Sequence, residues 1–177
     1  MNLGGLTFMF PLALGMATTI RVGFHVGSGD LAAAQLTSKV AISLTIAAAA
    51  LLAVFVVSFR AHVAGLYSSE AQVLALATSL MAFVAVYQLF DSVQATVLGA
   101  LRGYKDTQVP MMITLVGYWL VGIPVGCVLG FGWIGEPMGV YGFWVALVVS
   151  LAVVAIGVCA RLVWLSQNPN RIDRLSA

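Results

Sequence analysis

The sequence predicts an all-α, polytopic membrane protein with about five transmembrane helices. Of its 177 residues, 62% are hydrophobic and 8% are charged, whereas a soluble domain has roughly 25% charged residues. The mean hydropathy is +1.05, and the charged residues leave five long windows between them. So few charges cannot cover a water-facing surface. The composition therefore argues against a soluble enzyme, a nucleic-acid-binding protein and a disordered chain.

The five windows are long enough to cross a bilayer. A helix needs about 20 apolar residues to span roughly 30 Å of hydrocarbon. None of the windows alternates apolar and polar residues, as the strands of a membrane barrel do. Within a transmembrane region of residues 1–165, we expect helices at approximately 3–24, 38–60, 71–101, 107–131 and 138–163.

The first two predicted spans are joined by a short polar turn. The first window ends at Arg21, and the second begins after Lys39. Residues 27–30 read Gly-Ser-Gly-Asp, which is typical of a turn. Asp30 is expected to cap a helix that begins at Leu31, because its carboxylate can accept a hydrogen bond from a free backbone N–H of the first turn.

Asp91, in the third span, is the one ionisable residue deep inside a window. It lies about 15 Å from the end of that span at 1.5 Å per residue. A carboxylate at this depth costs roughly 2.5–3.5 kcal/mol, so it normally faces a cavity or a partner. Tyr87 and Gln94 lie on the same helix face, and Gln88 flanks it. We favour a cation or proton site at Asp91 over a purely structural aspartate, with Gln88 and Gln94 lining its cavity.

Small residues and prolines mark the fourth and first spans. Gly122, Gly126 and Gly130 repeat every four residues, a pattern typical of close helix packing. Pro124 lies among them and is expected to bend the helix, with packing favoured over a gating hinge. In the first span, Pro11 is equally consistent with packing and with a kink that lines the cavity.

The remaining chemistry-bearing side chains do not form a catalytic or metal site in the predicted topology. His25 and His62 fall in opposite loops, whereas Cys127 and Cys159 lie at different depths of the membrane. Ser28 lacks a base and a nucleophile motif. We therefore expect no enzyme activity, no cofactor and no metal beyond Na⁺ at Asp91.

Positive charge is concentrated on one side of the predicted bundle. The first and third connections and the C-terminal tail share a side and contain seven of the eight Lys and Arg residues. By the positive-inside rule this side is cytoplasmic. The C-terminus is therefore expected in the cytoplasm, with residues 166–177 as a flexible tail, and the N-terminus outside.

The start of the chain has no polar flank and no basic segment of the kind that opens a signal peptide. We therefore expect it to be the C-terminal part of a larger transporter.

Several short segments, in order and in spacing, resemble the multidrug and toxic compound extrusion (MATE) transporters, in their NorM-like bacterial branch. The resemblance runs from about residue 2 to residue 165. It rests on Phe10–Leu12, Ala17–Gly23, Tyr87–Ser92, Leu101–Thr107, Tyr118–Trp119, Gly122–Pro124, Glu136–Gly139 and Gly142–Trp144.

This resemblance implies part of an antiporter of the bacterial inner membrane. Such a protein exports cationic or zwitterionic drug-like compounds in exchange for Na⁺ or H⁺. The family's cation-linked aspartate falls on Asp91 and its neighbouring tyrosine on Tyr87. The family's N-terminal lobe and the first helix of its C-terminal lobe have no counterpart in this chain. The missing lobe is therefore an expected partner, and the chain alone is expected to be incomplete.

Two other interpretations fit the sequence less well. A lipid or polysaccharide flippase of the same superfamily would need a basic cavity, but the predicted spans contain no Lys or Arg. A non-transporting membrane packing protein would have no need of Asp91. The sequence does not distinguish Na⁺ from H⁺, and it does not define the substrate range.

Overall fold

The computed structural model describes residues 3–65, 71–133 and 136–176, with side chains at 9–58, 83–133, 136–169, 171, 172 and 175. Within these residues the chain forms helices and no strand. In chain order they are α1 (Leu3–Gly27), α2 (Leu31–Gly65), α3 (Ala71–Gly103), α4 (Gln108–Val116), η1 (Gly117–Gly122), α5 (Ile123–Phe131), α6 (Val140–Ser166) and α7 (Pro169–Ser176).

Five helical segments of the described chain are long and apolar enough to cross a membrane. They confirm the predicted fold class. The fourth is composite, because α4, η1 and α5 follow one another without a break. The five segments are Met9–Gly27, Leu31–Ser58, Phe83–Gly103, Gln108–Phe131 and Val140–Ser166.

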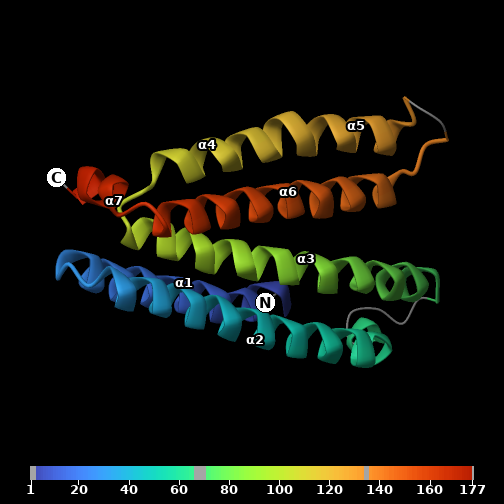
Figure 1. Cartoon of the computed structure of the whole chain (residues 1–177). Coiled ribbons are helices and arrows are strands. Elements are labelled where there is room, and N and C mark those ends of the chain that lie inside the picture. Colours follow the sequence, from blue (N-terminus) through green and yellow to red (C-terminus); the bar gives the residue numbers. More distant parts are fainter. Residues whose placement is uncertain (1–2, 66–70, 134–135, 177) are drawn as a thin grey trace.

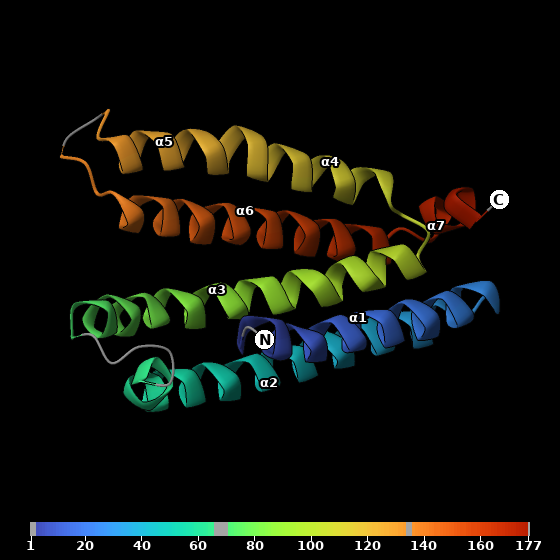
Figure 2. The ribbon, with the colours of Figure 1, turned by 180° about the vertical axis from the view of Figure 1, so that it is seen from behind.

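The long helices lie side by side, and α3 is central to the arrangement (Figure 1). Helices α1 and α2 pack on α3 and on each other, and α6 packs on another side of α3. The α4–η1–α5 segment packs on α6 at the edge farthest from α2, which the reverse view also shows (Figure 2). The α1–α2 turn, the α3–α4 turn and α7 lie at one end of the bundle (Figure 1). The connections that the sequence analysis grouped on one side thus share one end.

The turn between α1 and α2 occupies residues 28–30, where the Gly-Ser-Gly-Asp segment predicts it. Gly29 has a φ of +77°, and the Asp30 N–H donates to the His25 carbonyl at 2.9 Å. The Ala33 N–H donates to Asp30 Oδ1 at 3.0 Å, which confirms Asp30 as the cap of α2. These bonds satisfy free backbone groups at both helix ends. Helix α1 therefore continues past Arg21, α2 begins before Lys39, and three residues separate the two helices.

The contact between α1 and α3 depends on two facing glycines. A Cβ on Gly99 would lie 2.3 Å from the Gly15 carbonyl oxygen, so no other residue fits there without movement of the backbone. At the same level the Thr19 hydroxyl donates to the Gly99 carbonyl at 2.8 Å. Small residues let helices approach closely in a membrane, where lipid is as apolar as the side chains themselves.

The glycine repeat of the fourth span faces α6. A Cβ on Gly126 or Gly130 would meet the Phe143 ring, and one on Gly122 would meet Ser150. Pro124 is the second residue of α5, which follows directly on the π-helical turn η1, and it is exposed. Proline cannot donate the next helical hydrogen bond, and widened turns are one way in which a helix accommodates that loss.

The last residues form α7, a helix that the sequence analysis did not predict. Ile172 is 1% exposed and belongs to the core cluster that contains Leu162 and Leu165 of α6. Ile172, about one helical turn after Asn168, thus packs α7 against the end of the bundle. Much of the predicted outer loop between Arg60 and Glu70, with the His62 side chain, lies outside the described residues.

Candidate cation-coupling site

Asp91 borders a cavity of about 180 Å³ between α1 and α3. Gln94 lines the same cavity, and Arg102 lies at its end nearest the α3–α4 turn. The other lining residues are small or apolar: Leu12, Gly15, Met16, Ala95 and Leu98. The predicted pairing of Asp91 with Gln94 on one face of α3 is therefore present, and Asp91 is the sole carboxylate among the lining residues.

The Tyr87 hydroxyl lies one helical turn from the Asp91 carboxylate, close enough to interact with it electrostatically. Both side chains are partly buried. A phenol hydroxyl beside a carboxylate does not neutralise it, so the carboxylate keeps lone pairs for a cation or a proton. This is the arrangement that the spacing of Tyr87 and Asp91 on α3 predicts.

Tyr118 joins this site from the fourth span, a contact that sequence reasoning missed. Its hydroxyl donates to Gln94 Oε1 at 3.1 Å, and it lies close enough to Asp91 to interact with it electrostatically. In the sequence, Tyr118 stood out only as part of a segment that resembles the MATE transporters. One feature of the sequence could have predicted this contact. The Tyr118 hydroxyl lies in the middle of an apolar span, where it needs a hydrogen-bond partner.

Tyr118 is carried by the π-helical turn η1. Such turns are rare and occur frequently at functional sites, because the extra residue in the turn redirects a side chain. The adjacent Gly117 is buried against Val154 of α6, and a Cβ there would lie 2.2 Å from Val154 Cγ2. Close packing on α6 therefore sets the position from which Tyr118 reaches α3.

A second groove of about 480 Å³ adjoins the Asp91 cavity. The two share Leu98 and Arg102 as lining residues, and Tyr118 also lines the second groove. Its remaining walls come mainly from α4, with Met111, Thr114 and Leu115 among them. The two cavities thus follow one another along α3, from Asp91 toward the α3–α4 turn.

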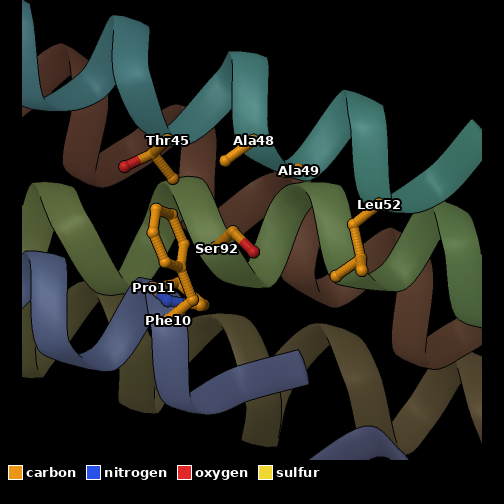
Figure 3. A pocket seen from close by; sticks show the side chains of 7 residues that line it. All are labelled: Phe10, Pro11, Thr45, Ala48, Ala49, Leu52 and Ser92. Carbon is orange, nitrogen blue, oxygen red and sulfur yellow. The ribbon is translucent and has the colours of Figure 1, made fainter. Parts of the chain in front are cut away.

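Pro11 and Gln88 do not line the Asp91 cavity. Pro11 lies with Ser92 on a separate apolar pocket of about 310 Å³ between α1, α2 and α3 (Figure 3). Gln88 is buried and donates from Nε2 to Ser92 Oγ at 3.2 Å. Of the three residues named as cavity-lining, only Gln94 therefore shares the cavity with Asp91.

The oxygen donors around Asp91 suit one positive charge. One carboxylate, two phenol hydroxyls and an amide supply hard oxygen ligands with a single negative charge. No group of three His, Cys, Asp or Glu side chains that could hold a multivalent metal occurs in the described part of the chain. Cys127 and Cys159 are both free thiols.

Comparison with known proteins identifies the family. Residues 1–128 match the family model described as MatE. The chain belongs to the MATE family. It is 44% identical over 173 residues to the multidrug resistance protein NorM of Aliivibrio fischeri, an alignment that covers 97% of this chain and 38% of the relative. It is 41% identical over 170 residues to the multidrug resistance protein MdtK of Edwardsiella ictaluri, which covers 96% of this chain and 37% of that relative.

A solved structure supports the same architecture. The crystal structure of the eukaryotic MATE transporter AtDTX14 matches 97% of this MATE chain with a TM-score of 0.86, at 23% sequence identity. The aligned part is 38% of the AtDTX14 chain. The MATE chain thus spans less than two fifths of the length of the relatives that it matches.

Proposed function

We propose that this chain forms part of a secondary active multidrug efflux antiporter of the bacterial inner membrane, with its C-terminus in the cytoplasm. It would export organic cations and drugs in exchange for Na⁺ or H⁺. The observation that carries the proposal is the half-buried Asp91, which borders a cavity between α1 and α3 and lies one helical turn from Tyr87. Relatives named multidrug resistance proteins support the transport class.

The coupling step follows from the chemistry of one carboxylate in a medium of low dielectric. Asp91 can be charged with a bound cation, or neutral with a bound proton. A cationic drug would compete for this charge or for the conformation that the coupling ion stabilises. Ion binding from the outside would then favour drug release, as two linked equilibria between inward-facing and outward-facing states.

The neighbouring groups have separate roles in this proposal. Tyr87 holds the carboxylate through its hydroxyl and offers an aromatic face to a cation. Gln94 and Tyr118 connect the site to the fourth span. The exposed Arg102 places a positive charge at the end of the same cavity. When one cation is bound at Asp91, this charge disfavours the entry of another cation from that end.

Replacement of the carboxylate tests the proposal. In a transporter completed with the N-terminal part of a NorM relative, Asp91→Asn should abolish ion-driven drug efflux while the protein still inserts. The amide keeps the shape and hydrogen bonding but removes the titratable charge, and a neutral group costs less to bury. Asp91→Glu should retain partial efflux, and Tyr87→Phe should have a milder effect than Asp91→Asn.

The measurement is Na⁺- or H⁺-driven efflux from proteoliposomes, normalised to inserted protein. Asp30→Asn is the matched control, because Asp30 lies in the exposed α1–α2 turn and asparagine caps helices as well as aspartate does. Wild-type coupled efflux by Asp91→Asn would overturn the proposal and make Asp91 a structural residue.

A further inference from the structure

Two arginines lie beside one tryptophan at the end of the bundle that carries α7. The Arg161 guanidinium carbon lies 4.6 Å from the centre of the Trp164 ring, and that of Arg171 lies 5.9 Å from the same ring. Arg161 and Trp164 belong to α6, and Arg171 belongs to α7. Both guanidinium groups therefore converge on one indole from two different helices.

The position of Arg171 depends on the packing of α7. The next residue, Ile172, is 1% exposed and packs in the core cluster with Leu165. The Asn168 amide donates to the Trp164 carbonyl at 2.6 Å and closes the end of α6. Arg171 is thus held next to Trp164 by a buried neighbour and a hydrogen-bonded turn, although its own side chain is exposed.

Within the described part of the chain, this cluster carries more positive than negative charge. Arg161 Nε donates to Asp106 Oδ2 at 2.6 Å, and Asp106 is 2% exposed. Among the side chains that the structure describes, Arg171 forms no ion pair. Two guanidinium groups thus face one carboxylate, and that carboxylate is buried on the Arg161 side.

The surplus charge and its setting fit a phospholipid phosphate. A guanidinium group presents a planar fork of N–H donors that matches phosphate oxygens, and its Nε–H is only one of five donors. Tryptophan is enriched at the membrane–water interface, where lipid phosphates lie. Anionic lipids give the cytoplasmic leaflet a negative surface potential that attracts basic groups beside transmembrane helices.

We propose that Arg161, Trp164 and Arg171 form a binding site for the phosphate of an anionic phospholipid headgroup in the cytoplasmic leaflet. The phosphate would bridge the ends of α6 and α7 while Asp106 keeps Arg161 oriented. The site lies outside the Asp91 cavity and does not depend on ion coupling there, although its place in the cytoplasmic leaflet rests on the proposed orientation of the C-terminus.

Native mass spectrometry of the purified protein, titrated with lipid, tests this site. Phosphatidylglycerol should bind to the wild type, whereas phosphatidylcholine, which is zwitterionic, should bind more weakly. Arg171→Gln should weaken phosphatidylglycerol binding by about fivefold, because a basic group near the surface contributes that much to the attraction. Arg171→Lys should keep the positive charge but lose the planar fork of N–H donors. The affinity of this variant for phosphatidylglycerol should therefore be intermediate.

Arg21→Gln is the matched control, because Arg21 is an exposed arginine on α1 that makes none of these contacts. It should bind phosphatidylglycerol as the wild type does. Wild-type binding by Arg171→Gln, or an equal loss in Arg21→Gln, would overturn the proposal in favour of unspecific attraction. Displacement of the lipid by millimolar inorganic phosphate would show a site for a free anion and would overturn the lipid assignment.

Discussion

Tyr118 and Gln94 are the two side chains by which the fourth span reaches the Asp91 site. The 3.1 Å hydrogen bond between them joins η1 to α3 across 24 positions of the sequence. A movement of the fourth span would therefore change the surroundings of Asp91, since Gln94 lines the same cavity. This pair is the residue-scale basis for coupling between the ion site and the rest of the bundle.

Removal of the Tyr118 hydroxyl tests this connection. In the completed transporter, Tyr118→Phe should lower the apparent affinity for the coupling ion by about three- to tenfold, because a hydrogen bond contributes about 0.5–1.5 kcal/mol. The maximal efflux rate at saturating ion should change little. The measurement is the dependence of proteoliposome efflux on ion concentration.

Tyr104→Phe is the control for this change. Tyr104 is fully buried in the α3–α4 turn, and burial raises its pKa. Ser38 lies near its hydroxyl, but outside hydrogen-bond geometry, so no described residue is its partner. Ion dependence should stay at the wild-type value in this variant. An equal loss in both variants would remove the specific role of Tyr118.

Lys105 is the strained residue of the α3–α4 turn. Its φ is +61°, the left-handed region that favours glycine. The Asp106 N–H donates to the Leu101 carbonyl and the Lys105 N–H to the Arg102 carbonyl, both at 3.0 Å. This is the bonding pattern of a Schellman helix end, which usually has glycine at the left-handed position.

Lys105→Gly should raise the free energy of unfolding by about 1 kcal/mol, because glycine adopts this conformation without a clash at Cβ. The greater entropy of glycine in the unfolded chain offsets part of the gain. Thermal unfolding in detergent measures the change. Gly29→Ala, at the equivalent position after α1, should lower stability by a similar amount, and the idea fails if both variants shift in the same direction.

At the scale of whole elements, the packing of α1 on α3 rests on backbone contact rather than on side-chain volume. Gly99→Ala would place a methyl group against the Gly15 carbonyl and force the two helices apart. Overpacking of this kind costs about 1–3 kcal/mol. The hydrogen bond from the Thr19 hydroxyl to the Gly99 carbonyl would lengthen as the two helices move apart.

We therefore expect Gly99→Ala to lower the unfolding temperature clearly. Gly27→Ala is the matched control: Gly27 is also helical, and a Cβ there would meet nothing within 4 Å. That change should be neutral or stabilising, since alanine favours a helix over glycine by about 1 kcal/mol. An unaltered unfolding temperature for Gly99→Ala would show that the two helices separate without cost.

At the scale of the whole molecule, the charge distribution determines the expected orientation. The α1–α2 turn, the α3–α4 turn and α7 lie at one end of the bundle (Figure 1). Because most of the basic residues belong to these connections or to the adjoining helix ends, that end should face the cytoplasm. The α5–α6 connection, which contains Glu136, should then face outward.

Cysteine labelling tests this orientation. In a background in which Cys127 and Cys159 are replaced by alanine, a membrane-impermeant maleimide should label Glu136→Cys on intact cells. Lys105→Cys should react only after the cells are opened. Both positions are exposed in the structure, so a difference in labelling reflects the side of the membrane. Labelling of Lys105→Cys from outside would reverse the topology.

The sequence by itself determined the number of spans, the end that carries the positive charge and the pairing of Asp91 with Tyr87 and Gln94. Each of these features depends on residues that are close together in the sequence. A span is a run of apolar residues, a cap such as Asp30 needs a residue three positions away, and neighbours on one helix face follow from the helical repeat.

Only the tertiary structure decided which cavity each helix face borders. Asp91 and Ser92 are adjacent in sequence, yet they line different cavities. The partner of Gln94 lies on η1, and the partner of Arg161 lies in the α3–α4 turn. The physical reason is that the spans are apolar on all sides. Lipid and neighbouring helices are equally apolar surroundings, so hydropathy does not separate a packed face from a lipid-facing one.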